Sequence, residues 1–407
     1  MAIGPAGATG TAPNGAHNAT LQPGIWLWRD PPSLPPRQWL LGSALLRGQA
    51  TLLGSPGGTG KTALAVAMAL AVITGRRDIC GLHSFLRGKV WFITLEDDLD
   101  ELDRRIAAAM LEHKVAPADV GRDLWVNHPD LTLLTQGRDH AARLTDDVDL
   151  LIDYIRQSDF LLVVIDLLVK AHKLEENSND HMDALITAAN QIARETRAAV
   201  LLPHHFRKDS ALGGRDAIRG GGALVDGARI ALTMLGMSAA EAGGFGVPED
   251  DAGRYVRLAN AKANMTPKAR AEDWYELVSV PLGNTGVDPL YPSGDEVQAI
   301  VPWQQPKLMD GMDHAVMAAI FGRLGDASVI FHEKDGNHRN WVGTVVMTLA
   351  SKNRDQARRI IQLWLDSGTL VPTPYKTSKR EQAMRVMLDA SKAAAILAGL
   401  GAGQVNP

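Results

Sequence analysis

The sequence has almost no cysteine and no long apolar run. Cys80 is the one cysteine among 407 residues, so no disulfide can form within the chain, as expected for a reducing compartment. The longest apolar stretch, Ala63 to Thr74, is too short to cross a bilayer. The N-terminus lacks the positively charged region and apolar core of a secretory signal. We therefore expect a cytoplasmic protein with no membrane role.

The sequence also lacks a large charge of either sign and any internal repeat. The formal net charge is −4, so a surface for nucleic acid would have to be local. A hydrophobic fraction of 45% and a charged fraction of 22% are ordinary for a soluble globular protein. Composition therefore carries no global signature of nucleic-acid binding, and the function has to be inferred from the motifs.

Changes in composition divide the chain into five predicted segments. Residues 1–24 are rich in Gly, Ala, Pro, Asn and Thr, which predicts a disordered tail. An α/β core domain is expected over 25–300, a linker over 301–312, a small winged-helix-like domain over 313–392 and a flexible tail over 393–407.

Short apolar runs alternate with amphipathic stretches through the first half of the core. This alternation predicts a mostly parallel sheet with helices on both faces. The expected strands are Ala50–Gly54, Val90–Leu95, Phe160–Asp166 and Ala198–His204, followed by Ile230–Leu235, Tyr255–Ala263 and Trp274–Val280. The expected helices are Ala63–Ile73, Leu99–Glu112, Leu144–Gln157 and His181–Arg197, and in the small domain His314–Leu324, Trp341–Ala350 and Arg354–Ser367.

A glycine-rich octapeptide, Ser55-Pro-Gly-Gly-Thr-Gly-Lys61-Thr62, joins the first strand to the first helix. Its glycines allow backbone N–H groups to surround phosphates at a helix N-terminus. Lys61 is expected to reach the β- and γ-phosphates, and the Thr62 hydroxyl to bind Mg²⁺. The predicted ATP-binding residues are Ser55, Gly57, Gly58, Thr59, Gly60, Lys61, Thr62 and Ala63.

Acidic residues end two further predicted strands. Asp166 follows the apolar run that begins at Phe160, where P-loop ATPases place the carboxylate that holds Mg²⁺ through water. Glu96 and Asp97 end the strand that begins at Val90. Hydrolysis needs a group that orients or deprotonates the attacking water, and we assign this role to Glu96, with Asp97 as the alternative.

Two histidines, His204 and His205, end the fourth strand. Adjacent strand residues point to opposite faces, which argues against a shared metal site. One of the two is expected to sense the γ-phosphate, with simple packing at the strand end as the alternative. The loop that follows is basic and glycine-rich, and its predicted DNA contacts are Arg207, Lys208, Arg215 and Arg219.

The motifs, together with Arg219-Gly-Gly-Gly-Ala-Leu-Val-Asp-Gly-Ala-Arg229 and Asn260-Ala-Lys-Ala-Asn264, occur in a characteristic order. In this order the chain resembles the RepA-type hexameric replicative helicases of broad-host-range plasmids, within the wider AAA_25 group of RecA-like ATPases. The resemblance spans residues 48 to 282 and implies a RecA-like P-loop fold.

The resemblance also implies an assembly. It implies a ring of six subunits with MgATP at each interface, single-stranded DNA in the channel and replication-initiation proteins as possible partners. Arg229 matches the arginine that such a subunit extends to the nucleotide of its neighbour, and Lys262 matches the lysine beside it.

The C-terminal segment is basic in an otherwise acidic chain. Residues 321–392 contain 12 Lys and Arg against 7 Asp and Glu. The stretch from Lys352 through Arg354 and Arg358 to a Gly turn resembles the second half of a winged-helix domain, in which these three residues would face DNA phosphates. A helical module that binds protein is the alternative.

Three functions are compatible with these patterns. The first is an ATP-driven DNA motor, a ring helicase or translocase in phage or mobile-element replication. The second is a recombination filament, and the third is a DNA-binding regulator switched by ATP.

Overall fold

The computed structural model describes residues 26–206, 222–265, 272–285, 292–335, 340–377 and 379–402. The chain divides into two units, Met1–Arg37 and Gln38–Pro407. In the first unit, the described residues form one short 3-10 turn, Pro31–Ser33, and leave Trp26 and Trp28 exposed. The predicted disordered tail lies outside the described residues.

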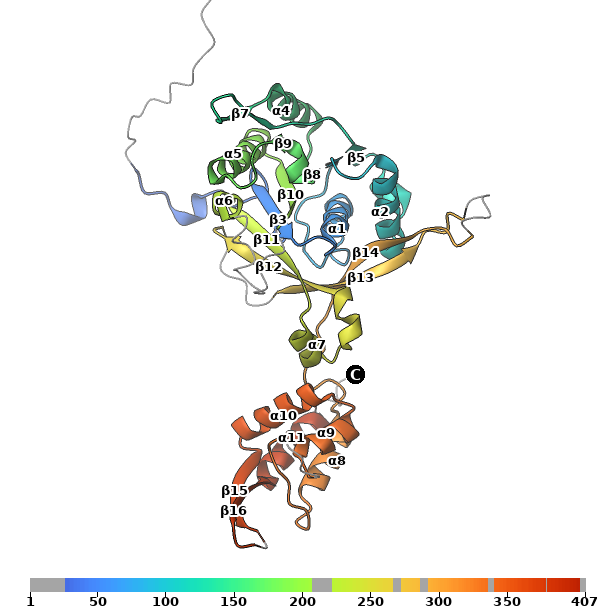
Figure 1. Ribbon diagram of the computed structural model, residues 1–407, viewed down its shortest axis with the longest axis vertical. Coiled ribbons are helices and arrows are strands. Elements are labelled where there is room, and N and C mark those ends of the chain that lie inside the picture. The colour runs from blue at the N-terminus through green and yellow to red at the C-terminus, as the bar shows by residue number, and fades with distance from the viewer. Residues whose placement is uncertain are drawn as a thin grey trace, which may run out of the picture. The chain divides into compact units, whose positions relative to one another are not determined.

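The second unit is built around a nine-stranded sheet (Figure 1). In spatial order its strands are β14 (Glu296–Trp303), β13 (Asp273–Pro281), β12 (Tyr255–Ala263), β11 (Ile230–Gly236), β3 (Ala50–Ser55), β10 (Ala199–His205), β8 (Leu162–Asp166), β4 (Val90–Thr94) and β5 (Leu124–Asn127). From β11 to β5 neighbouring strands are parallel, whereas β12, β13 and β14 pair antiparallel. The α/β class and the mostly parallel sheet predicted from the alternating pattern are confirmed.

Helices cover both faces of this sheet (Figure 1). On one face lie α1 (Lys61–Thr74), α2 (Leu99–Glu112) and α3 (Pro117–Val120), and on the other lie α4 (Asp146–Ser158), α5 (Asn179–Thr196) and α6 (Gly222–Gly227). Nearly every residue of α1 is buried, which explains why its sequence is apolar on all sides. In the described part of the chain, no helix is long and apolar enough to span a membrane.

Strand β10 shows how the sheet separates its two cores. Ala199 and Leu201 face the core that contains α1, whereas Val200 and Leu202 face the core that contains α5. This alternation continues to the end of the strand and determines where its two histidines lie.

Smaller elements connect these layers. They are the pair β1 (Trp39–Leu41) and β2 (Leu45–Leu46), the small sheet of β7 (Ala142–Leu144), β6 (Leu134–Gln136) and β9 (His172–Lys173), the 3-10 turns Leu168–Ala171 and Glu249–Arg254, and helix α7 (Ala239–Phe245).

The C-terminal residues have a hydrophobic core of their own, with Trp364 almost completely buried. Their elements are α8 (His314–Leu324), α9 (Val342–Ala350), α10 (Arg354–Asp366), the hairpin of β15 (Leu370–Lys376) and β16 (Gln382–Leu388), and α11 (Ala390–Ala402). The three predicted helices are present. Only the first strand of the hairpin, β15, lies in the stretch from Gly368 to Tyr375 for which a hairpin was predicted, and the second strand, β16, follows it.

The boundary between core and linker is corrected by β14. The core was expected to end at residue 300 and a linker to cover 301–312, but β14 continues to Trp303 and pairs along its whole length with β13. Pro302 is compatible with this strand because β14 is an edge strand, where a missing N–H group breaks no ladder on the open side.

The expected flexible tail, 393–407, is also corrected, because α11 extends to Ala402. Alanine has the highest helix propensity, and the segment is rich in it. Ala393 is buried, and Ile396, Leu397 and Leu400 pack against the same core. These four positions recur at helical spacing, so one face of α11 is apolar.

Candidate functional site

The loop between β3 and α1 turns tightly at glycines. Gly58 and Gly60 have φ angles of 76° and 82°, which side chains other than glycine rarely adopt. A Cβ atom on Gly60 would lie 2.6 Å from the side chain of Leu277 in β13. The antiparallel part of the sheet therefore packs against the loop and holds it closed at the start of α1.

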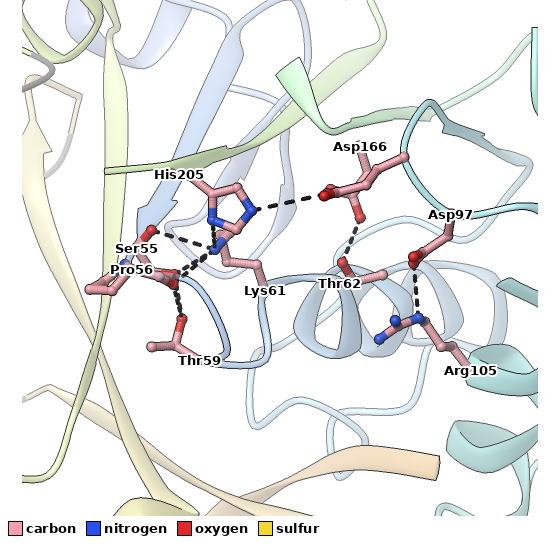
Figure 2. Close-up of polar contacts among 10 residues, drawn as sticks. Ser55, Pro56, Thr59, Lys61, Thr62, Asp97, Arg105, Asp166 and His205 are labelled. Carbon is pink, nitrogen blue, oxygen red and sulfur yellow. Dashed lines mark hydrogen bonds and ion pairs between the residues drawn. The ribbon is translucent and has the colours of Figure 1, made fainter. Parts of the chain in front are cut away.

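Lys61 begins α1 and its side chain folds back along the loop (Figure 2). Its Nζ atom donates to Ser55 Oγ at 2.9 Å, to the Pro56 carbonyl at 3.0 Å and to His205 Nδ1 at 2.9 Å. Burial lowers the pKa of the ammonium to about 8, although Asp166 and Glu96 oppose this shift. The Ser55 hydroxyl thus binds the lysine directly, which glycine or alanine at this position could not do.

Thr62 and Asp166 meet at the carboxyl ends of the strands (Figure 2). Thr62 Oγ1 donates to Asp166 Oδ2 at 2.8 Å. Burial raises the pKa of Asp166 to about 6, against the lowering effect of the Thr62 hydrogen bond. A hydroxyl and a carboxylate are the oxygen ligands that Mg²⁺ prefers.

These two residues fit Mg²⁺ only as part of a larger ligand set. Among the described residues, no three His, Cys, Asp or Glu side chains gather closely enough to hold a metal by themselves. Mg²⁺ usually keeps several waters and binds one or two protein oxygens together with substrate phosphates. The pair formed by Thr62 and Asp166 therefore suits a magnesium ion that arrives with a nucleotide.

The acidic residues after β4 have three different environments. Asp97 forms an ion pair with Arg105 at 2.9 Å, and Asp98 caps the N-terminus of α2 through the Glu101 N–H group. The side chain of Glu96 is 53% exposed, and its Oε2 atom lies 4.0 Å from Nε2 of His205. Since Asp97 is neutralised by an arginine, Glu96 is the carboxylate better placed to act on a water molecule.

The two histidines at the end of β10 lie on opposite faces of the sheet. His205 lies on the α1 side, where its Nδ1 atom contacts Lys61 (Figure 2). Its Nε2 atom lies 4.0 Å from Glu96 Oε2. Because Nδ1 accepts from Lys61, neutral His205 carries its proton on Nε2, which faces Glu96. Burial and the Lys61 charge lower the pKa of His205, which favours this neutral form.

His204 is placed outside the site. It is buried beside Phe206 on the other face, and burial lowers its pKa to about 4. Of the two histidines considered for a sensor, the structure therefore brings only His205 to Lys61.

Residues of the nucleotide loop, the acids after β4 and His205 surround a cavity of about 240 Å³. It is lined by Gly58, Gly60, Lys61, Thr62, Ala63, Glu96, Asp97, Arg105, Leu167, His205 and Gln298. Sequence reasoning missed Arg105 and Gln298. Arg105 lies four residues after Glu101 and pairs with it at 3.0 Å, a spacing that is also common on solvent-exposed helix faces.

Arg229 and Lys262 do not lie at this cavity. Arg229 immediately precedes β11, whose first residue, Ile230, is paired with Thr51 near the start of β3. Lys262 pairs with Ala231 and donates to the Asp226 carbonyl. Both cations therefore lie at the amino end of β3, one strand length from the loop that follows its carboxyl end, which is about 16 Å at the usual rise per residue.

The predicted DNA contacts divide into two groups. Arg207, Lys208, Arg215 and Arg219 lie outside the described residues. In the C-terminal domain, Arg354 and Arg358 both pair with Asp335, at 3.2 and 2.5 Å, and Lys352 donates to the Asp310 carbonyl at 2.6 Å. The side chains of the two arginines are 64% and 52% exposed, whereas that of Asp335 is 12% exposed.

We expect the affinity for MgATP to fall as the pH rises through 8. Burial lowers the pKa of Lys61 to about 8, so a growing fraction of the side chain is neutral above that pH. Phosphate oxygens beside the amine favour its charged form, so binding raises this pKa and takes up protons. Calorimetry in buffers of different ionisation enthalpy should show larger proton uptake near pH 9 than near pH 7. Equal uptake at the two pH values would place Lys61 away from the phosphates.

One comparison with known proteins bears on this site. Residues 18–211 match the model of a family described as an AAA domain, AAA_25. The matched part contains the loop from Ser55 to Thr62, both strand-end acids Glu96 and Asp166, and His205. The match supports a P-loop ATPase that binds nucleotide, usually with Mg²⁺, and the sheet with its flanking helices fits the core of such an enzyme. Arg229 and Lys262 lie beyond the match.

Proposed function

We propose that this P-loop ATPase is a DNA motor, a RecA-like ring of six subunits that moves along single-stranded DNA in phage or mobile-element replication. The observation that carries the proposal is the separation between the nucleotide cavity and Arg229. Lys61 and Arg105 line the cavity, whereas Arg229 lies exposed at the other end of the strands. A cation in that position can reach a γ-phosphate only on a second copy of the chain.

In the proposed reaction, each of these residues has a separate role at one interface. Backbone N–H groups of the loop and Lys61 bind the phosphates, while Thr62 and Asp166 hold the magnesium that accompanies them. Glu96 orients the attacking water and accepts its proton. His205 connects Lys61 with Glu96, so it can report whether a γ-phosphate is present to the loop that follows β10.

Arg229 of the neighbouring subunit would complete this site. Its guanidinium would stabilise the negative charge that develops on the transferred phosphoryl group. Lys262 holds the Asp226 carbonyl on α6, so its role here is to support the turn that presents Arg229. These assignments rest on the resemblance described above and on the position of both residues at one end of β11.

The DNA contacts are proposed in two places. The basic loop that follows His205 would grip the phosphate backbone in the channel, as its arginines, lysine and glycines suggest. The C-terminal domain, with its helices and β15–β16 hairpin, would add a winged-helix contact through Lys352, Arg354 and Arg358. Both arginines are exposed, and in this contact they would exchange Asp335, whose side chain is 12% exposed, for DNA phosphates.

Two experiments test this function. ATP turnover with and without single-stranded DNA should show stimulation by DNA, and a strand-displacement assay should show whether duplex is opened. Mass measurement with MgATP and DNA should give a closed hexamer. Open-ended polymers would favour the recombination filament, and slow turnover that ignores DNA would favour the switched regulator.

Arg229→Ala should leave ATP binding intact and lower turnover by about 10²-fold or more, the usual effect of removing a transition-state cation. Adding Lys61→Ala subunits, which carry an intact Arg229, should restore part of the turnover because mixed rings contain complete sites. Turnover of the mixture measures this rescue. A mixture no more active than its separate components would argue against a contact between subunits.

A further inference from the structure

A second cavity, of about 320 Å³, lies at the amino end of the parallel strands. Helix α5 supplies one wall, and the residues that precede β3 and β11 supply the others. It is lined by Gly48, Gln49, Thr187, Asn190, Arg194, Gly227 and Arg229. Apart from Arg229, none of these residues has been given a role above.

The polar side chains from α5 form one face of the helix. Thr187, Asn190 and Arg194 are spaced by three and four residues, so they line up along it. Asn190 accepts from the Ala50 N–H group through Oδ1 at 3.4 Å, which leaves its NH₂ group as the donor. The face therefore offers a guanidinium, an amide NH₂ and a hydroxyl to whatever enters the cavity.

The lining of this cavity carries two positive charges, and Asp183 lies beside its wall, with Oδ1 3.2 Å from the position that a Cβ atom on Gly227 would take. No carboxylate belongs to its lining, and neither Arg194 nor Arg229 forms an ion pair with a described residue. Glu195, the acid next to Arg194 in the sequence, instead pairs with Arg156 at 3.1 Å. Two free guanidinium groups with neutral hydrogen-bond donors are the chemistry that binds phosphate oxygens.

The packing of α6 against α5 brings the two arginines to the same cavity. A Cβ atom on Gly227 would lie 2.3 Å from the Ile186 side chain. Only a glycine permits this approach. Because α6 lies so close to α5, Arg229, which follows α6 after Ala228, lies beside the face of α5. Ile186 and Leu224, both buried in the same core, hold the two helices together.

We propose that this cavity receives the terminal phosphates of the nucleotide bound by a second copy of this chain, and that Arg194 is a second cation acting there beside Arg229. The proposal rests on the assembly proposed above and adds to it a residue and a shaped subsite. A walled cavity suits the compact end of a triphosphate, whereas a strand of DNA needs a groove that follows several phosphates.

The test compares Arg194→Ala with a matched control, Arg122→Ala. Arg122 is also exposed, and it lies on the turn before β5, outside both cavities. Arg194→Ala should lower turnover about 10-fold to 10²-fold with MgATP affinity nearly unchanged, because the arginine side chain stabilises the transition state more than it stabilises bound ATP. Arg122→Ala should keep wild-type turnover. Arg194→Lys, which retains the charge, should recover only part of the loss because lysine cannot form two parallel bonds.

A second readout does not depend on turnover. Sedimentation with MgADP and aluminium fluoride, which mimics the transferred phosphoryl group, should show less assembly for Arg194→Ala than for Arg122→Ala. Equal assembly of the two variants would overturn the proposal. Melting curves of both variants check that any loss does not come from unfolding.

Mixing separates the failure of this inference from the failure of the proposed function. Lys61→Ala subunits should rescue both Arg194→Ala and Arg229→Ala. Rescue of Arg229→Ala alone would overturn the role of Arg194 and leave the ring in place. Rescue of neither would overturn both proposals. If Arg194→Ala weakened binding of single-stranded DNA with basal turnover unchanged, the cavity would bind DNA phosphates and the proposal would be wrong.

Discussion

Lys61→Ala should abolish ATP hydrolysis and remove most nucleotide binding. The Lys61 ammonium is the one cation held inside the loop, by Ser55, Pro56 and His205, at the helix start where phosphates bind. Its removal takes away a charge-assisted contact to the phosphates, and loss of a single such donor costs about 10²–10³-fold in turnover. Titration with a fluorescent ATP analogue and a phosphate-release assay measure the two effects.

Lys173→Ala is the matched control, since Lys173 is exposed on β9 and does not line the nucleotide cavity. It should bind and hydrolyse ATP as the wild type does. Normal turnover in Lys61→Ala, in a sample with an unchanged melting temperature, would remove the assignment of the site. Loss of the melting transition would call for Lys61→Met, which preserves the bulk of the buried side chain.

Glu96→Gln should bind MgATP and fail to hydrolyse it. The amide keeps the shape of the side chain but cannot accept the proton of the attacking water, and removing a general base typically costs about 10²–10⁴-fold. Single-turnover measurement with radiolabelled ATP should show nucleotide retained without release of phosphate. This variant is also the one to use for measuring affinity in the absence of turnover.

Asp97→Asn tests the alternative carboxylate. Asp97 is paired with Arg105 at 2.9 Å, and its carbonyl accepts from Thr94 and His128. Its substitution should loosen Arg105 and produce a smaller loss than Glu96→Gln. A larger loss in Asp97→Asn, with Glu96→Gln near wild type, would move the role of the base to Asp97.

Most of the core was predictable because its periodicities are strong. Strand β12 and helices α2 and α8 begin and end at the predicted residues, since buried faces impose regular spacing over their whole length. The small strands β6, β7 and β9 were missed because two or three residues carry no readable period. β14 was missed because Pro302 and Trp303 at its end resemble the start of a linker when the paired strand is not known.

The nucleotide loop and its acids were predictable for another reason: each follows a strand, and the carboxyl ends of parallel strands meet at one edge. The choice between His204 and His205 was not. Alternation says that they face opposite ways, but only the position of α1 decides which face holds Lys61. Arg105 could not be recognised from the sequence because its partner Asp97 precedes α2, whereas Arg105 lies within that helix. No helical spacing therefore marks the pair.

The placement of the two cavities at opposite ends of the same strands restricts the symmetry of the proposed self-association. A two-fold dimer buries one patch against itself, and it would leave both the loop and Arg229 without their counterparts. If the nucleotide loop of one copy instead contacts Arg229 of the next, the two end copies of every open assembly keep one loop and one Arg229 without a partner. Such an association has no natural stop at two, and only the rotation between successive copies decides whether growth closes on itself or continues as a helix.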